Sequence, residues 1–594
     1  MTPNLAGRPD APPIRPSVPP PVAFRRTVPV PSLPPDRASR RVARRLLPAA
    51  ALPLLVASAG PASSEPAAPA PRSVAECPVL LDASTLESPP VLPREFRAAW
   101  ITPVDGGEWP TRPGMDDATS QAELRAAIQR ASDIGLNAIV LHVRTAADAL
   151  YPTTRVPWSS YLVGPDGRAP GFDPLAFALS EAHARGLQVH VWFNPFRAAP
   201  PNRSRAAVGA QAIARRNPQW IVRYGSQQWI DPGFPAARQE ALADILEVVD
   251  RYDVDGVHID DYFYPYREER TIRTRVGKGR RRRTVTRTET IRFDDDVSWA
   301  RHGRGTGMER DAWRRDNVSQ FVAALYREVK ARKPEVAVGI SPFGIWRPGA
   351  APGVYGLDAY AEIYADSRKW LREGWLDYVA PQLYWELDGE QQRFRRLDEW
   401  WRRENVQGRH VFPGLLTMRV ASRGAPWSGS AITSQIEWLR AAREGRPDAQ
   451  GHVHFRMSTL MPQAQGALGD RLATSLYATP ALPPANPWLG PTPPAAPEVT
   501  PWCPDPSTLP GDGGAQYGAP RGPALSVLPG DTLRVRWWAV QLLDSVGTWH
   551  TRVVPAAERR LSAELAPGAV ANAVAVSAVT PSGVQSPSRM VRLR

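Results

Sequence analysis

Two aspartates stand side by side in the stretch 255–266, DGVHIDDYFYPY, where an apolar run gives way to aromatic residues. Paired carboxyl groups can cleave a glycosidic bond, because one protonates the leaving oxygen while the other acts as nucleophile or base. If the apolar run is a strand, alternation points Asp260 inward and Asp261 the other way, to the rim. We therefore expect Asp260 to be catalytic and Asp261 to support the loop or contact the substrate.

The partner carboxylate of Asp260 has four candidates, which are Glu386, Asp261, Asp148 and Asp366. We expect Glu386, because it ends a different predicted strand and can face Asp260 across an opening. In this assignment Asp260 is the nucleophile or general base and Glu386 is the general acid. A retaining mechanism needs carboxyl groups about 5–5.5 Å apart and an inverting one about 6.5–9.5 Å, and the sequence leaves this choice open.

Eight strand-like runs alternate with helix-like segments between residues 94 and 477. The strand-like runs cover 96–101, 138–144, 187–194, 254–260, 336–343, 377–385, 410–416 and 452–458. Such alternation predicts an α/β fold with a parallel sheet covered by helices, and eight repeats predict a (β/α)8 TIM barrel. An open doubly wound sheet is the alternative, but a glycine-rich phosphate turn after its first strand would be expected, and none is present.

Polar residues of one parity recur near the same end of five predicted strands, where a barrel of this kind has its active site. Such an alignment is hard to explain as core packing. The polar residues that we expect to contact a substrate are Arg144, Asp148, His190, Asn194, Arg197, His258, Asp261 and Gln382.

Aromatic residues gather at the same strand ends. Flat rings stack on pyranose faces while polar groups bind hydroxyls, so this combination predicts a sugar ligand. The aromatic residues that we expect in the site are Trp100, Trp158, Trp192, Tyr262, Tyr264, Tyr384 and Trp385. A metal held by His142, His190 and His258 is an alternative, but these histidines are scattered singly over different strands, so we expect no metal and no other cofactor.

The N-terminal region predicts export. Residues 1–39 are rich in proline and arginine and should be disordered, whereas 40–64 combine a basic segment, a short apolar run and small residues, the layout of a secretory signal. The apolar run is too short to span a bilayer and contains two prolines, so we do not expect an integral membrane protein. We expect the exported protein in the periplasm, in the cell envelope or in the medium. Residues 65–93 are a predicted linker.

Two further features lie outside the barrel strands. An insertion at 267–309 contains alternating β-branched and basic residues (271–293), which predicts an exposed basic hairpin, either a solvated decoration or an arm that touches an anionic polymer. After a proline-rich linker at 478–521, residues 522–594 form short alternating runs that predict a small all-β sandwich resembling fibronectin type III or immunoglobulin-like modules.

Composition limits the partners. The net charge of +14 is high, but the chain has neither zinc-finger spacing nor a helix-turn-helix pattern, so we expect no nucleic acid partner. The chain has two cysteines, Cys77 and Cys503, and neither belongs to a CxxC motif. In an oxidising compartment these two could form a disulfide that ties the start of the barrel region to its end.

Several long motifs resemble the bacterial glycosyl hydrolase-like 10 family over roughly 94–475. They are AWITPVDGGEW, the stretch 137–197, YDVDGVHIDDYFYP, GISPFGIW and DYVAPQLYW. The family is described as (β/α)8 glycosidase-like envelope proteins, and it includes a divisome-associated hydrolase that cuts peptidoglycan strands lacking stem peptides. The resemblance therefore implies a peptidoglycan substrate and partners among division or envelope proteins. A non-catalytic wall-binding scaffold and a hydrolase of an exopolysaccharide are the two alternatives.

Overall fold

The computed structural model describes most of the chain from residue 78 to its end. Residues 1–77 lie outside it, and with them the predicted disordered terminus, the signal segment and Cys77. The described part is 78–594 without 84–85, 105, 165–166, 200–207, 277–281, 388–392, 421–426, 444–450, 465–466, 491 and 504–522. In that part no helix is both long and apolar enough to cross a membrane.

The central sheet consists of parallel strands. They are β2 (Phe96–Ile101), β3 (Ala138–Arg144), β4 (Gln188–Phe193), β8 (Gly256–Ile259), β11 (Ala337–Ile340), β12 (Tyr378–Val379), β13 (His410–Val411), β14 (Gly414–Leu415) and β15 (Gly451–His454). Their order is β13-β12-β11-β8-β4-β3-β2-β15-β14. Because β13 and β14 belong to one stretch, 410–415, the strand pairings run in a ring. Each predicted run overlaps one or two of these strands, so the predicted parallel α/β fold is confirmed.

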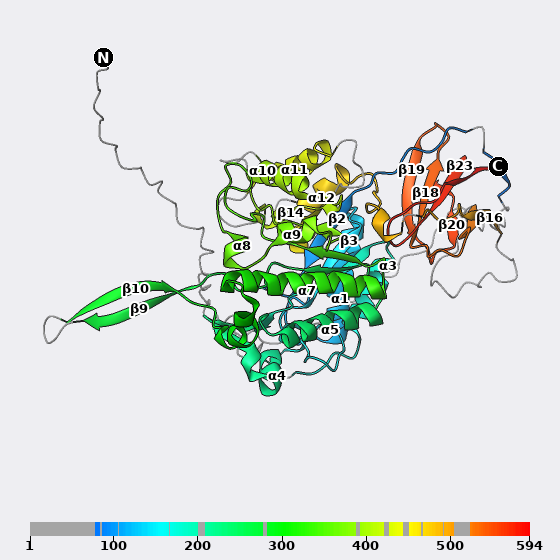
Figure 1. The fold of residues 1–594 in the computed structure, drawn as a ribbon. Coiled ribbons are helices and arrows are strands. Elements are labelled where there is room, and N and C mark those ends of the chain that lie inside the picture. The colour runs from blue at the N-terminus through cyan, green and yellow to red at the C-terminus, as the bar shows by residue number, and fades with distance from the viewer. Residues whose placement is uncertain are drawn as a thin grey trace, which may run out of the picture. The chain divides into compact units, whose positions relative to one another are not determined.

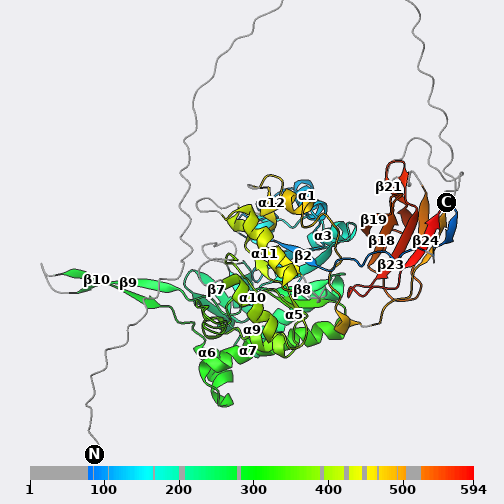
Figure 2. The ribbon, with the colours of Figure 1, turned by 90° about the horizontal axis from the view of Figure 1, so that it is seen from above.

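Helices follow the strands and cover the outside of the sheet (Figures 1 and 2). The main ones are α1 (Asp117–Asp133), α3 (Pro174–His183), α5 (Pro235–Arg251), α7 (Arg310–Arg332), α9 (Ser367–Arg372), α10 (Arg393–Glu404), α11 (Gly429–Ala441) and α12 (Leu468–Thr474). Local sequence sets their starts: Asp173 caps α3 by accepting from the Leu175 amide at 3.0 Å, and Pro174 follows with a backbone angle suited to a first turn.

A small antiparallel sheet lies between β4 and α5 in the chain. It orders β5 (Arg197–Ala199), β7 (Gln227–Ile230) and β6 (Ile221–Tyr224). The sequence did not predict this sheet, because its strands have three or four residues and carry little alternation. It matters for the site because β5 begins at Arg197.

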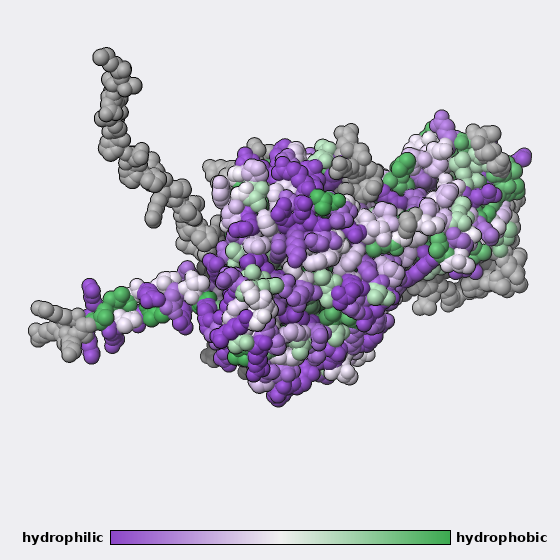
Figure 3. Space-filling model, viewed as in Figure 1, coloured by the Kyte–Doolittle hydropathy of each residue, from purple (hydrophilic) through white to green (hydrophobic). Residues whose placement is uncertain are grey.

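The predicted basic hairpin is present. Strands β9 (Glu269–Val276) and β10 (Arg283–Thr290) pair antiparallel along their whole length and stand clear of the helices in both ribbon views. Nearly all of their side chains are exposed, and the space-filling view shows hydrophilic and hydrophobic residues together on this arm (Figure 3). The exposed hydrophobic residues include Val276 and Val285.

The C-terminal part contains two antiparallel sheets with a common apolar core. The first orders β1 (Leu80–Asp82), β24 (Arg589–Leu593), β23 (Ala573–Val579), β18 (Trp537–Leu543) and β19 (Trp549–Pro555), and the second β16 (Glu498–Trp502), β17 (Ala524–Leu528) and β20 (Arg560–Ser562).

Two strands of these sheets correct the predicted boundaries. Both β1 and β16 lie in segments that the sequence predicted to be linkers, 65–93 and 478–521. Each is an edge strand that pairs on one side only, β1 with β24 from the other end of the chain. A short edge strand depends on pairing with a distant strand more than on its own alternation of apolar and polar residues. Its local sequence therefore does not predict it.

Candidate active site

The two aspartates directly after β8 lie against each other. Their carboxyl groups are hydrogen bonded, and the Asp261 amide donates to Asp260 Oδ1 at 2.8 Å. Asp260 is 8% exposed and Asp261 2%. The prediction that Asp261 points to the rim is therefore wrong. Regular alternation ends with the strand at Ile259, and the chain then turns so that both carboxyl groups enter the interior.

The pKa of Asp260 is raised more strongly than that of Asp261. Burial raises the pKa of Asp260 well above its ordinary value, and the negative charge of Asp261 raises it further. Burial also raises the pKa of Asp261, but the hydroxyl of Tyr266 donates a hydrogen bond to Asp261 Oδ2 and offsets part of the rise. Two carboxylates in contact cannot both ionise cheaply, so the contact favours a pair that shares one proton, with Asp260 as the more readily protonated group.

Arg197 supplies a positive charge that acts on the pair. Its Cζ lies 4.0 Å from the ring centroid of Tyr262 and 5.8 Å from that of Trp229. The guanidinium lowers the pKa of both Asp260 and Asp261, although burial has the larger effect on each. Burial likewise raises the pKa of Tyr262 to about 12. Arg197 and Tyr262 thus lie beside the carboxyl pair, and their contact with a substrate stays a prediction.

Residues after β12 reach the pair, although β11 lies between β12 and β8 in the sheet. Gln382 donates from Nε2 to Asp260 Oδ1 at 3.3 Å and to the Ser341 carbonyl at 3.0 Å. Tyr384 is half-buried, and its pKa is raised well above its ordinary value by burial and then by the charges of Asp260 and Asp261. The structure therefore brings both predicted residues, Gln382 and Tyr384, to the carboxyl pair.

Buried rings form a polar layer inside the sheet. The hydroxyl of Tyr378 lies 2.9 Å from His190 Nδ1 and 2.9 Å from His258 Nδ1. His258 Nε2 also lies 2.9 Å from Ser341 Oγ and 3.3 Å from Trp100 Nε1. Burial lowers the pKa of His190 to about 4 and that of His258 well below its ordinary value, so both rings are neutral at pH 7. These residues bind one another inside the sheet and support the site from within.

His142 and Trp192 pack against each other on the neighbouring strands β3 and β4. Their rings stack with centroids 3.7 Å apart, and Thr102 Oγ1 lies 2.9 Å from His142 Nδ1. Asn194 Nδ2 lies 3.4 Å from His142 Nε2 and donates to the Thr145 carbonyl at 3.2 Å. Trp192 Nε1 and Asn194 Oδ1 are buried without a hydrogen-bond partner among the residues that the structure describes. A donor and an acceptor are thus available for substrate hydroxyl or amide groups.

Arg144 does not belong to the site. A register shift in the pairing of β3 with β4 lies between His142 and Arg144, so the two residues no longer share a face. Arg144 Nη2 donates to Asp244 of α5 at 3.0 Å, and Nη1 donates to the Asn194 carbonyl at 2.8 Å. The prediction that Arg144 binds substrate is therefore wrong, because a bulge reverses the alternation on which it depended.

Asp148 and Tyr264 also have other surroundings. Asp148 accepts from Thr145 Oγ1 at 3.1 Å and from the Ala146 amide at 3.0 Å, and so fixes the loop after β3. Tyr264 is buried edge-on against Phe293 and Tyr364, and the charges that act on its hydroxyl are led by Asp231 and Asp295. Neither contact involves the carboxyl pair.

Trp158 and Trp385 are half-buried at the end of the sheet where the carboxyl pair lies. Trp158 follows β3 and bridges to Ala149, while Trp385 follows β12 and contacts Phe343 edge-on. Their partly exposed rings remain candidates for sugar stacking.

The other candidates for a second carboxylate differ in their surroundings. Glu386 is exposed, and Asp366 caps α9 and accepts from Trp346 Nε1 at 3.1 Å. The remaining buried carboxylates of the described residues each accept a hydrogen bond from a basic side chain or a backbone amide. They are Glu95, Glu108, Asp148, Asp231, Asp244, Asp255, Asp295, Asp377 and Asp398.

Two groups were missed by the sequence analysis. Tyr266, the donor to Asp261, lies in the same stretch, 255–266, and its proximity to the aspartates was the available signal. Glu108 accepts from the Thr102 amide at 3.1 Å and pairs with Arg456 Nε at 3.0 Å, which ties the ends of β2 and β15 together. No local pattern pointed to Glu108, because its partner lies at the far end of the sheet region.

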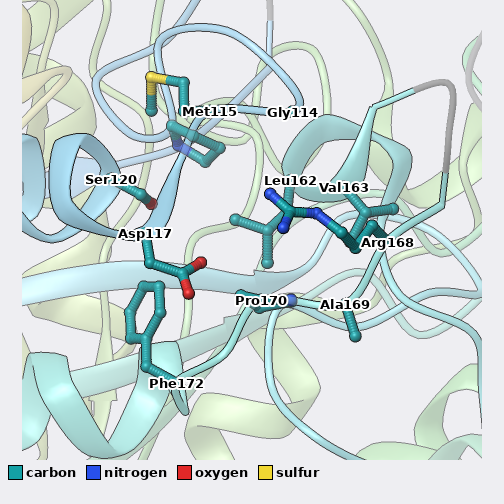
Figure 4. A pocket seen from close by; sticks show the side chains of 11 residues that line it. Gly114, Met115, Asp117, Ser120, Leu162, Val163, Arg168, Ala169, Pro170 and Phe172 are labelled. Carbon is teal, nitrogen blue, oxygen red and sulfur yellow. The ribbon is translucent and has the colours of Figure 1, made fainter.

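A small pocket lies between the loops that follow β2 and β3 (Figure 4). Its volume is about 80 Å³, and the side chains of Asp117 and Arg168 lie on opposite sides of it. Ligand sites for sugar-sized molecules usually occupy about 300–1,000 Å³. The pocket is too small for such a ligand and includes none of the predicted site residues.

The described residues bear on possible metal sites and on one of the two cysteines. Among the described residues, no group of three histidine, cysteine, aspartate or glutamate side chains could hold a metal ion. Cys503 is disulfide-bonded. Cys77 lies outside the described residues, so the pairing of these two cysteines stays a prediction.

The fold and the site define a class, the parallel α/β proteins with a buried carboxyl pair at a strand end. The model of the family Glycosyl hydrolase-like 10 matches residues 95–428, and the chain belongs to this family. It is 36% identical over 417 residues to Glycosyl hydrolase YngK of Bacillus subtilis, with 68% of this chain and 76% of the relative covered. It is 30% identical over 397 residues to Glycosyl hydrolase DigH of Escherichia coli K12, with 63% and 85% covered.

Solved structures are more distant. The catalytic domain of β-amylase from Paenibacillus polymyxa is similar with a TM-score of 0.40 and 10% identity, over 65% of this chain and 99% of that chain. α-L-Fucosidase isoenzyme 2 from Paenibacillus thiaminolyticus gives a TM-score of 0.39 and 13% identity, over 65% and 49%. Both TM-scores are below 0.5, so nothing about function follows from them.

Proposed function

We propose that this protein is an exported glycoside hydrolase that cleaves the glycan strands of peptidoglycan, after amidases have removed the peptides. The observation that carries the proposal is the buried, hydrogen-bonded pair of Asp260 and Asp261 at the end of β8, beside Arg197 and the ring of Tyr262. Membership of the family and the names of its relatives support glycoside hydrolysis. The basic, signal-like segment at 40–64 supports export.

The proposed architecture matches this activity. We interpret the ring of strand pairings as a (β/α)8 barrel, whose active site lies at the C-terminal strand ends. The C-terminal strands would form a fibronectin type III-like module that spaces the barrel from the wall or binds to it. Long glycan strands would lie across the open end of the barrel, over the half-buried rings of Trp158, Tyr384 and Trp385.

Asp260 is the group proposed to protonate the leaving oxygen. Burial and the neighbouring Asp261 raise its pKa well above the ordinary value, which favours the protonated carboxyl group that a general acid requires. Gln382 holds Asp260 Oδ1 in place, and the unpaired atoms Trp192 Nε1 and Asn194 Oδ1 would bind the sugar. Arg197 balances the charge that remains on the pair.

The test is digestion of amidase-treated cell-wall sacculi, with soluble sugar products separated and quantified. Wild type should release peptide-free oligosaccharides. Release by Asp260→Asn should be about 10²–10⁴-fold slower, which is the usual contribution of a general acid. Asp294→Asn is the matched control, because the side chain of Asp294 is exposed and lies in the insertion. Equal, negligible release by wild type and Asp260→Asn would indicate a glycan-binding scaffold, and activity on an exopolysaccharide alone would exclude the wall substrate.

A further inference from the structure

The carboxyl pair is too close for either familiar two-carboxylate mechanism. Asp260 and Asp261 are in hydrogen-bond contact, whereas retaining glycosidases place their two carboxyl groups about 5–5.5 Å apart and inverting ones about 6.5–9.5 Å. Carboxyl groups that touch cannot stand on opposite faces of one anomeric carbon. Asp261 can therefore be neither the nucleophile opposite Asp260 nor the base that activates a water on the opposite face.

The described part of the chain offers no other buried carboxylate for that position. Glu108 is paired with Arg456, Asp148 is bound by the loop after β3, and Asp244 is paired with Arg144. Glu386 is exposed after β12. The structure thus presents an acid and an adjacent carboxylate, but no enclosed protein nucleophile.

We propose, on the basis of the proposed function, that the substrate itself supplies the nucleophile. The attacking atom would be the carbonyl oxygen of the 2-acetamido group on the sugar whose bond is cleaved. The site would then be specific for N-acetylated hexosamines, the class of sugar that carries this group beside the anomeric carbon.

The steps balance without a cofactor. The acetamido oxygen forms a bond to C1 while the bond from C1 to the glycosidic oxygen breaks, and Asp260 gives its proton to that oxygen. Asp261 accepts the hydrogen bond of the acetamido N–H and can take its proton as the oxazoline ring forms. Water then adds to C1 and breaks the ring bond, while Asp260 recovers a proton from the water and Asp261 returns the N–H proton. The configuration at C1 is retained.

The contacts of Asp261 suit this role. Asp261 is held by Tyr266, so that a hydroxyl group fixes its orientation and stabilises its ionised form. Arg197 lies near enough to lower the pKa of Asp261 and to stabilise the same charge. An ionised, oriented carboxylate beside a protonated acid can bind an amide N–H and polarise the acetamido group toward attack.

Three measurements on the wild-type protein test the inference. The substrate is amidase-treated sacculi, compared with the same material after chemical de-N-acetylation. We expect cleavage of the de-N-acetylated strands to fall by at least about 10²-fold, inhibition by N-acetylglucosamine-thiazoline, a stable mimic of the cyclised intermediate, and retained configuration in the product by NMR. Asp261→Asn should slow cleavage of the acetylated strands by about 10²–10⁴-fold, and Asp294→Asn should not.

The two proposals fail in different ways. If sacculi are not cleaved at all, the proposed function fails and this inference fails with it. If sacculi are cleaved but the product is inverted, the thiazoline does not inhibit, or de-N-acetylated strands are cleaved equally fast, the inference is overturned and the proposed function stands. A folded Asp261→Asn protein with wild-type activity would overturn it as well.

Discussion

Tyr266 donates a hydrogen bond to Asp261, the carboxyl group that lies against Asp260. The tyrosine is in turn edge-on to Tyr262 and Phe343, which fix its ring. This arrangement makes the two aspartates unequal, because the hydroxyl donor lowers the pKa of Asp261 and the charge of Asp261 raises the pKa of Asp260. A turn of a few residues after β8 therefore produces an acid and a base from two identical side chains.

Removing the hydroxyl with Tyr266→Phe should reduce the difference in pKa between Asp260 and Asp261. The hydrogen bond lowers the pKa of Asp261, so its loss raises that pKa. Activity requires ionised Asp261, so the acidic limb of the pH–rate profile should move to higher pH, and kcat should fall roughly tenfold, about the 1.4 kcal/mol of one charge-assisted hydrogen bond. Tyr355→Phe, an exposed tyrosine, is the control. An acidic limb that does not move would contradict the assignment of the charge to Asp261.

Asp260→Asn should make the protein more stable at neutral pH. The folded-state pKa of Asp260 is raised above its unfolded value, so its contribution to stability is complete below the unfolded pKa and is lost as the pH rises through the folded pKa. An asparagine cannot ionise and avoids this loss of unfolding free energy. The loss begins at the unfolded pKa and is about 1.4 kcal/mol for each pH unit above it, and it stops growing once the pH exceeds the folded pKa.

Thermal unfolding at several pH values measures this effect. The midpoint of Asp260→Asn should exceed that of wild type by about 2–4 °C per kcal/mol at pH 7 and should approach it near pH 4. A constant difference between the two proteins at all pH values would show that the carboxyl group of Asp260 does not titrate in this range.

The sequence was sufficient for the parallel α/β sheet and for three residues that the structure brings together. The strands were recognisable because buried parallel strands are continuous apolar runs, and Asp260, Gln382 and Tyr384 follow such runs, while their roles stay predictions. The small sheet that places Arg197 was not recognisable, because its strands are held by each other rather than by their own pattern.

Alternation failed at two places for a physical reason. It holds only inside a regular ladder, and the register shift after His142 turns Arg144 outward. Beyond Ile259 the strand has ended, so Asp261 turns inward beside Asp260. A bulge and a strand end are set by the neighbouring strands, which a single sequence does not show.

Arg144 should be important for stability and not for catalysis. Its guanidinium is buried against Asp244 of α5 at 3.0 Å, and Arg155 Nε also donates to Asp244 at 2.7 Å, so Arg144→Met removes one of the two basic partners of a buried carboxylate. Because Arg155 remains, we expect a smaller cost than the roughly 3–5 kcal/mol of breaking an isolated buried pair. We expect a lower denaturant midpoint, with activity per folded molecule close to that of wild type. Arg144→Met combined with Asp244→Leu should recover part of the loss, and a specific loss of kcat would return Arg144 to the site.

Glu386→Gln decides between the carboxylate that the sequence favoured and the one that the structure places beside Asp260. Glu386 is exposed after β12, whereas Asp261 is buried in contact with Asp260. If the substrate supplies the nucleophile, Glu386 has no role in proton transfer, and its loss should change kcat/KM by no more than about threefold, as for an ordinary surface substitution. The comparison is with Asp261→Asn under the same conditions on amidase-treated sacculi. A fall of about 10²-fold or more for Glu386→Gln, in a protein with unchanged thermal stability, would identify Glu386 as a catalytic carboxylate that closes over bound substrate. That result would restore a two-carboxylate mechanism and limit Asp261 to orienting Asp260.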